Sequence, residues 1–165
     1  MHRLPADQRA EEQTVSSPRT LRIQSWLIGG LSLLADRLTK QLVMARFHPG
    51  QSLPFFPPLL RLTYVQNTGA AFGVLRGQQF LFIVISVVVI GWVSRELLTR
   101  PPTEPRIAWA YGLILGGAVG NLIDRLRLGY VVDFIDLRVW PVFNVGDSAI
   151  TVGVALLLWE AMRRR

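Results

Sequence analysis

The feature of this sequence that most constrains its fold is a stretch of 18 uncharged residues, 77–94, bounded by an arginine on each side. A helix of this length and composition can cross about 30 Å of hydrocarbon. Two further runs are similar: residues 107–123 carry no charge, and residues 141–159 carry only Asp147. Together with the first apolar segment, these runs predict four transmembrane helices, at residues 23–45, 77–95, 107–125 and 141–161.

The composition favours a membrane protein and removes several other classes. Only 18% of the residues are charged, against about 25% in an ordinary soluble domain. The net charge of +7 comes from arginines that flank the apolar runs, which indicates a membrane protein and not a nucleic-acid-binding protein. The chain has no cysteine, and its two histidines are far apart in the sequence. We therefore expect no disulfide, no metal site, no cofactor and no histidine-based catalysis.

The chain divides into a polar tail and one apolar domain. Residues 1–22 show no apolar period and are predicted to form a disordered cytoplasmic tail, whereas residues 23–163 are expected to form a single domain. Arginines are more frequent in the tail, in the loop 95–106 and at the C-terminus, which predicts two cytoplasmic termini. The outer segment 46–76 contains LLRLTYVQ, which is rich in strand-forming residues. The predicted fold is an all-α membrane protein with four transmembrane helices and a small β-rich extracytoplasmic cap.

Spacing indicates which polar side chains share a helical face. Asp36 and Lys40 are four residues apart, so they are expected to form an ion pair, with Arg37 turned elsewhere. In the third predicted helix, glycines at every fourth position lead to Asp124, and a neighbouring stripe contains Asn121 and Arg125. Such glycines are typical of close helix packing. Structural packing and a functional role both remain open for the polar members of these stripes.

Two aspartates come from separate elements near the outer side. Asp133 is predicted in the loop before the last helix, and Asp147 near the outer end of that helix. Two nearby carboxyl groups cannot both ionise cheaply, so one keeps a proton while the other takes a proton from the water that attacks a carbonyl. This is the chemistry of an aspartic peptidase. Five aspartates lie towards this side, so other pairings, interfacial helix caps and a proton relay remain open.

Five motifs narrow this choice. They are DRLTK (36–40), NTGAAFG (67–73), GGAVGNLIDR (116–125), VVDFID (131–136) and FNVGDSAI (143–150). Their order and placement resemble the lipoprotein signal peptidase (signal peptidase II) family over residues 23–163. The resemblance implies a bacterial plasma-membrane aspartic endopeptidase that removes the signal peptide of prolipoproteins by cutting before a diacylglyceryl-modified cysteine of the substrate. Its active site would face the extracytoplasmic side, and the expected partners are lipid-modified prolipoproteins and membrane lipids, with no nucleic acid and a monomeric enzyme.

The resemblance also implies roles for individual residues. Asp133 and Asp147 correspond to the catalytic pair, and Asp124 and Asp136 to structural supports. One departure is Gly146, where the family usually has alanine. Glycine at this position costs up to about 1 kcal/mol of helix stability. The residues that would bind substrate or order the site are Asp36, Lys40, Asn67, Gly69, Asn121, Arg125 and Asn144, with Ala70 and Ala71 beside Gly69 leaving room for a lipid-bearing peptide.

Two other functions fit part of the sequence. The VGD of residues 145–147 is similar to part of the GxGD motif of presenilin-type and prepilin peptidases, but Asn144 occupies the position of the first glycine. A proton-coupled transporter or channel subunit could use intramembrane aspartates as a relay. That function predicts inverted repeats, and the sequence shows no repeat of fixed period. Cleavage of a lipidated precursor by the purified protein would separate a peptidase from a transporter.

Overall fold

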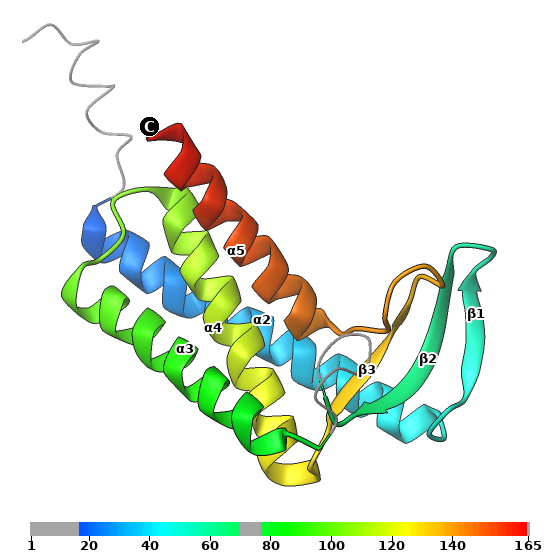
Figure 1. Ribbon diagram of the computed structural model, residues 1–165. Helices are drawn as coiled ribbons and strands as arrows, with labels where there is room; N and C mark the ends of the chain where they lie inside the picture. Colours follow the sequence, from blue (N-terminus) through cyan, green and yellow to red (C-terminus); the bar gives the residue numbers. More distant parts are fainter. Residues whose placement is uncertain (1–16, 70–76, 165) are drawn as a thin grey trace, which may run out of the picture.

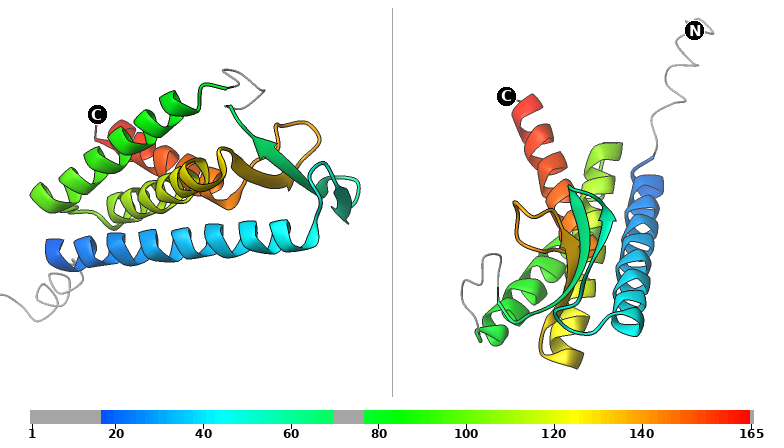
Figure 2. Two further views of the ribbon diagram at one scale, coloured as in Figure 1. Left: turned by 90° about the horizontal axis from the view of Figure 1, so that it is seen from below. Right: turned by 90° about the vertical axis from the view of Figure 1, so that its right-hand side faces the viewer.

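The computed structural model describes residues 17–69 and 77–164, which form helices packed against a small sheet (Figure 1). The helices are α2 (Pro18–Arg46), α3 (Gln79–Thr99), α4 (Pro105–Leu128) and α5 (Val145–Arg163). The strands are β1 (Ser52–Phe56), β2 (Leu60–Asn67) and β3 (Val131–Asp136). The start of α2 and the end of α5 lie at one end of the helical bundle, and the sheet lies at the other end (Figure 2).

Three helices of the described chain, α3, α4 and α5, are long and apolar enough to cross a membrane. All three helices end a few residues after the predicted segments. α4 also begins earlier, at Pro105, whereas α3 begins at Gln79 and not at residue 77, and α5 at Val145 and not at residue 141. The Asn144 side chain caps α5, and this cap fixes the start of the helix. The helix α2 carries several charged side chains and does not belong to this apolar group.

The first helix begins at Pro18, five residues before the predicted boundary at Ile23. The Ser17 side chain accepts a hydrogen bond from the Thr20 amide at 3.2 Å, and Pro18 occupies the first helical turn. A serine cap followed by proline is a standard helix start, because the cap satisfies a free N–H and proline has none to satisfy. The remainder of the predicted tail, residues 1–16, lies outside the described residues.

Close contact between α2 and α4 sets the centre of the bundle. Gly112 and Gly116 of α4 face the backbone of α2, and an added Cβ at Gly112 would lie 2.6 Å from the Ser25 carbonyl oxygen. At Gly120, the same atom would overlap the Asp36 carboxylate. Only glycine allows the backbones to approach this closely. The predicted packing role of this stripe is therefore confirmed, and Asp36 is brought against α4.

The sheet is antiparallel, with the strand order β1-β2-β3. The predicted strand LLRLTYVQ is confirmed as β2. Residues 131–136 also form a strand, β3, where the sequence predicted a loop. This part of the prediction was wrong because β3 forms by pairing with β2, which lies far earlier in the chain, and the local sequence pattern does not show such a partner. Val43 of α2 packs with Tyr64, Val132 and Phe134, so a shared apolar core fixes the sheet to the bundle.

Candidate active site

Asp133 projects from the buried strand β3 into a set of amide side chains. The residue is 1% exposed. Its Oδ2 accepts a hydrogen bond from Asn67 Nδ2 at 2.8 Å, and its Oδ1 accepts one from Asn144 Nδ2 at 2.7 Å. Burial, followed by the nearby charge of Asp147, raises the pKa of Asp133 to about 7, although the two amides and Lys40 act in the opposite direction. Asp133 can therefore hold or release a proton near neutral pH.

Asp147 lies in the first turn of α5 and takes part in a capping box with Asn144. The Asp147 amide donates to Asn144 Oδ1 at 2.8 Å, and the Asn144 amide donates to Asp147 Oδ2 at 3.2 Å. The other carboxylate oxygen of Asp147, Oδ1, accepts from Asn121 Nδ2 at 2.8 Å. Because Asn144 also donates to Asp133, this single buried side chain joins both aspartates. The hydrogen bonds that cap α5 therefore also hold the two carboxyl groups in position.

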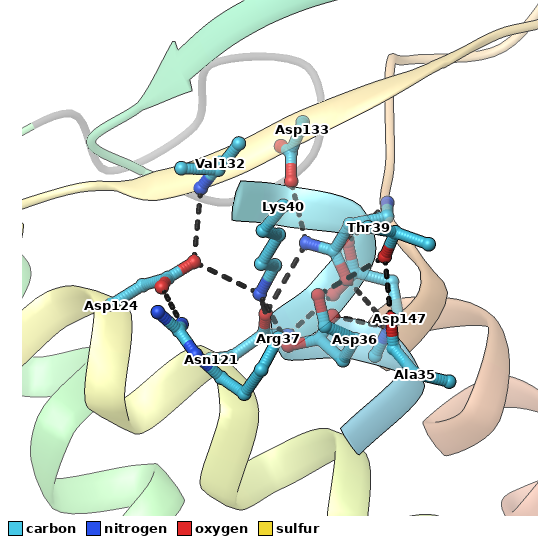
Figure 3. A network of polar contacts seen from close by, with 12 residues as sticks. Ala35, Asp36, Arg37, Thr39, Lys40, Asn121, Asp124, Val132, Asp133 and Asp147 are labelled. Carbon is cyan, nitrogen blue, oxygen red and sulfur yellow. Dashed lines mark hydrogen bonds and ion pairs between the residues drawn. The ribbon is translucent and has the colours of Figure 1, made fainter. Parts of the chain in front are cut away.

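Asn121 of α4 connects this pair to a buried lysine. Its Oδ1 accepts from Lys40 Nζ at 2.8 Å and from Asn144 Nδ2 at 3.2 Å. These two donors fix the orientation of the amide, because the oxygen must face them and the nitrogen must then face Asp147. Figure 3 shows Lys40, Asn121 and the aspartates in one connected polar network.

Lys40 also bridges two further carboxylates. Its Nζ lies 2.9 Å from Asp36 Oδ2 and 2.9 Å from Asp124 Oδ2, and all three side chains have no exposed area. The predicted pairing of Asp36 with Lys40 is confirmed. The other Asp36 oxygen accepts from the Gly146 amide at 2.9 Å, so this carboxylate links α2 to the start of α5. The ammonium group therefore donates a hydrogen bond to Asn121 and forms ion pairs with Asp36 and Asp124.

Arg37 is part of the same network, and the prediction that it turns elsewhere was wrong. Its guanidinium Nη1 pairs with Asp124 Oδ1. The other Asp124 oxygen, which contacts Lys40, also accepts from the Val132 amide at 3.2 Å (Figure 3). Val132 precedes Asp133, so Asp124 fixes the strand that carries Asp133. Helical spacing suggests different faces for Arg37 and Lys40, but a long arginine side chain can reach around the helix to a buried acid.

Both Asp133 and Asp147 line one cavity of about 290 Å³. Asn67, Gly69 and Arg125 line the same cavity, which is bounded on its other sides by apolar and aromatic residues that include Trp140 and Phe143. A second, mostly apolar cavity of about 420 Å³ shares Trp140, Phe143 and Asp147 with the first. The site therefore combines two acids with an extended apolar surface, as binding sites for amphipathic molecules do.

The remaining predicted residues contribute in different ways. The Gly69 amide donates to Asn67 Oδ1 at 2.9 Å, which orients the amide nitrogen of Asn67 towards Asp133. The Arg125 guanidinium lies over the ring of Phe82, with 5.2 Å between its Cζ and the ring centroid. Asp136 lies apart from the pair, at the end of β3. Ala70 and Ala71 lie outside the described residues.

Asp136 performs a structural task on the sheet. Thr63 donates to its Oδ2 at 2.7 Å, and the Arg138 amide donates to its Oδ1 at 2.9 Å. These hydrogen bonds lower the pKa of Asp136, the Thr63 bond most strongly.

Within residues 17–69 and 77–164, no group of three or more histidine, aspartate and glutamate side chains is arranged to hold a metal ion.

Known proteins resemble this chain in sequence and in fold. The signal peptidase (SPase) II family matches residues 28–163. The lipoprotein signal peptidase of Moorella thermoacetica is 46% identical over 136 residues, which cover 82% of this chain and 91% of that protein. The enzyme of the same name from Halothermothrix orenii is 49% identical over 131 residues, covering 78% and 90%.

Two solved structures share the fold, and both are described as bacterial membrane enzymes. One, at 2.3 Å resolution, has a TM-score of 0.80 and 31% identity, and the match covers 84% of this chain and 87% of that one. The other, at 1.9 Å resolution, has a TM-score of 0.78 and 31% identity, with 86% and 94% covered. The apolar helices, the polar site and these likenesses define a multi-pass membrane enzyme. The chain belongs to the signal peptidase II family.

Proposed function

We propose that this protein is a membrane aspartic endopeptidase that removes signal peptides from bacterial prolipoproteins and cuts before the diacylglyceryl-modified cysteine. Membership of the signal peptidase II family supports the peptidase activity. The observation that carries the aspartic mechanism is that Asp133 and Asp147, delivered by β3 and α5, line one cavity and are joined by Asn144. These two residues are the catalytic pair of the proposal.

The two carboxyl groups share one proton in this mechanism. At neutral pH burial favours the proton on Asp133, whose pKa is about 7. The partner carboxylate, Asp147, takes a proton from a water molecule as the water oxygen attacks the scissile carbonyl carbon. The protonated carboxyl group of Asp133 donates a hydrogen bond to the carbonyl oxygen and stabilises the negative charge that forms there. Collapse of the tetrahedral intermediate breaks the C–N bond as Asp147 gives its proton to the leaving nitrogen, so the pair again holds one proton.

The neighbouring polar residues hold this pair in position. Asn67, Asn121 and Asn144 donate to the aspartate oxygens, and Lys40 orients Asn121. Asp36 is tied to Lys40 and to the Gly146 amide. Gly69 and Arg125 line the cavity beside the acids, where the substrate backbone would lie. These contacts support site-ordering roles for all seven predicted residues, because a fixed site needs no reorganisation during the reaction.

The proposed topology has four membrane spans with α2 as the first. The charged side chains Asp36 and Lys40 of α2 are buried against α4. Its exposed face is instead a leucine stripe, formed by residues 27, 31, 34, 38 and 42, and this stripe suits contact with lipid. The arginine distribution places both termini in the cytoplasm and the candidate active site at the extracytoplasmic face of a bacterial plasma membrane. Residues 23–163 act as one domain, and the enzyme is a monomer.

The lipid part of the substrate explains binding in this proposal. Two acyl chains would hold the substrate in the bilayer and bring its modified cysteine to the depth of the aspartates. The apolar cavity lined by Leu137, Trp140 and Val152 is next to Asp147 and suits such a chain. The peptide itself then needs few sequence-specific contacts, so the enzyme should accept many prolipoproteins.

The test uses purified protein in detergent with a diacylglyceryl-modified precursor peptide. Asp133→Asn and Asp147→Asn should each lower the initial cleavage rate by at least about 1,000-fold, because an amide cannot exchange the shared proton. Asp136→Asn serves as the matched control and should keep most of the activity. An unmodified precursor should be cut far more slowly than the lipidated one. Substantial activity in either dyad variant would move the catalytic assignment to another aspartate.

A further inference from the structure

A buried glutamate gathers three arginines at the end of the bundle that lies away from the sheet (Figure 1). Glu160 of α5 is 3% exposed. Its Oε1 lies 2.8 Å from Arg164 Nε and 3.2 Å from Arg163 Nη2, and its Oε2 lies 3.7 Å from Arg106 Nη1 at the start of α4. We call Arg106, Arg163 and Arg164 the arginine cluster. Glu160 holds these three side chains together where the start of α4 lies beside the end of α5.

The arginine cluster keeps surplus positive charge and accessible donors. One carboxylate faces three guanidinium groups, and the side chains of the cluster are 50%, 52% and 55% exposed. The charge remains positive even when Glu104, which precedes α4, is counted. A guanidinium carries five N–H donors in a planar fork that matches the oxygens of a phosphate. The cluster can therefore pair with an anion without giving up its contacts to Glu160.

An apolar groove begins one helical turn away from the cluster. The groove has a volume of about 450 Å³ and lies among α2, α4 and α5. On α4, Arg106, Trp109 and Leu113 follow one helical stripe, and the last two line the groove. Its other walls include Ile28 and Leu31 of α2 and residues 145–152 at the start of α5, and Leu31 is 66% exposed.

We propose that the arginine cluster and this groove form a binding site for an anionic phospholipid. The phosphate would pair with the guanidinium groups, and an acyl chain would lie along the groove beside Trp109. Charge complementarity selects the occupant: basic pockets between membrane helices at a membrane surface bind anionic headgroups. An apolar groove that begins at Trp109, one helical turn from Arg106, also fits a lipid better than a free phosphate, which has no chain to fill the groove. The arginine cluster lies at the end of the bundle opposite to the candidate active site, whereas the groove extends from Trp109 towards the start of α5, where Ser148 also lines the apolar cavity beside Asp147.

The same end of the molecule offers a matched control pair. Arg95 and Arg100 lie at the end of α3 and are also exposed. Arg95 pairs with its neighbour Glu96 at 3.2 Å and has 63% of its side chain exposed. The double variant Arg95→Gln/Arg100→Gln changes the net charge by the same amount as Arg106→Gln/Arg163→Gln. It leaves Glu160 and the groove untouched.

Binding is measured by native mass spectrometry of the purified protein in detergent, with phosphatidylglycerol and phosphatidylcholine of identical acyl chains. Wild-type protein should retain phosphatidylglycerol preferentially. The cluster variant should lower that retention by on the order of fivefold for each arginine removed, while the control variant keeps it. Equal loss in both variants would show that only diffuse charge matters and would overturn the proposal. Unchanged retention in the cluster variant would overturn it as well.

Two further measurements test the occupant. Phosphatidylglycerol with brominated acyl chains should quench tryptophan fluorescence, and Trp109→Phe should remove a component of that quenching. Inorganic phosphate should displace the lipid no better than chloride at the same ionic strength, and displacement by phosphate would reduce the site to a simple anion site. If the arginine variants fail to fold, Glu160→Gln decides the question. Its extra positive charge should raise phosphatidylglycerol retention, and no rise in folded protein would contradict the proposal.

Discussion

Two pairs of aspartates lie within one polar network, and they have opposite surroundings. Asp36 and Asp124 face two cations, Lys40 and Arg37. Asp133 and Asp147 instead accept hydrogen bonds from amides, those of Asn67, Asn121 and Asn144. In the first pair each charge has an ionic partner. In the second pair the hydrogen-bond partners in the described structure are neutral.

The partners of a carboxyl group, and not its burial alone, decide whether it acts as a structural anchor or as a proton-transfer group. Asp36, Asp124 and Asp133 are all 1% exposed or less. Cations beside an acid pair with it and make it a fixed anchor between helices. Amides can orient an acid while leaving its proton exchangeable, so the second pair is suited to proton transfer.

The largest expected change in stability comes from Lys40→Met, which removes the shared cation of the first pair. Asp36 would be left buried without a cation, while Asp124 keeps Arg37, and breaking a buried ion pair in this way costs about 3–5 kcal/mol. The thermal midpoint in detergent, measured by circular dichroism, should therefore fall steeply. Asp133→Asn, which removes one carboxylate from the second pair, is the control and should melt close to wild type at pH 7. Similar thermal midpoints for Lys40→Met and wild type would show that the first pair does not depend on its shared cation for stability.

The raised pKa of Asp133 predicts a pH dependence of stability. Its pKa is about 7 in the folded protein, above the ordinary value of 3.8. Between these values the folded state holds a proton that the unfolded chain has lost, so this group makes stability fall as pH rises towards 7. The slope is at most about 1.4 kcal/mol per pH unit. Thermal midpoints from pH 5 to pH 8 should decline more in wild type than in Asp133→Asn, and parallel curves would contradict the raised value.

A smaller loss is expected for Arg37→Gln, because Asp124 keeps Lys40 and the Val132 amide as partners. Losing one charge-assisted contact costs about 1.5–3 kcal/mol when the group is buried. The lower end applies here because Arg37 is itself 16% exposed. The cleavage rate should also fall a few-fold, since Asp124 fixes the strand that carries Asp133. Arg37→Lys should recover part of both quantities, and a full effect in that conservative variant would exclude charge as the cause.

Gly146→Ala should have the smallest effect. The new Cβ would lie 3.0 Å from Asp36 Oδ1 and 3.1 Å from the Gly117 carbonyl oxygen, so these atoms must shift by a few tenths of an ångström. The helix preference for alanine over glycine, about 1 kcal/mol, offsets this cost. The thermal midpoint should move little, by the equivalent of less than about 1 kcal/mol. Gly117→Ala, whose Cβ would overlap the Gly146 carbonyl oxygen, should be clearly more damaging.

Relations within one helix were predictable from the sequence, whereas those between distant segments were not. The Asp36–Lys40 pair follows from a spacing of four residues, and the packing glycines follow from their repeat. The partner of Arg37 is 87 residues away, and no local period reveals it. The strand β3 was missed for the same reason, because it forms by pairing with β2 far earlier in the chain. Motifs placed Asp133 and Asn144 near the site without giving their contacts.

The capping box of α5 links the candidate active site to an observable far from catalysis, the exchange of backbone hydrogens with solvent. The Asp147 amide hydrogen is held by Asn144 Oδ1, and the Asn144 amide hydrogen by Asp147 Oδ2. These hydrogens can exchange only when the first turn of α5 opens, and that opening also separates the two aspartates. A molecule that occupies the cavity therefore slows exchange at both amides, so isotope labelling can detect an occupied site in protein that performs no cleavage.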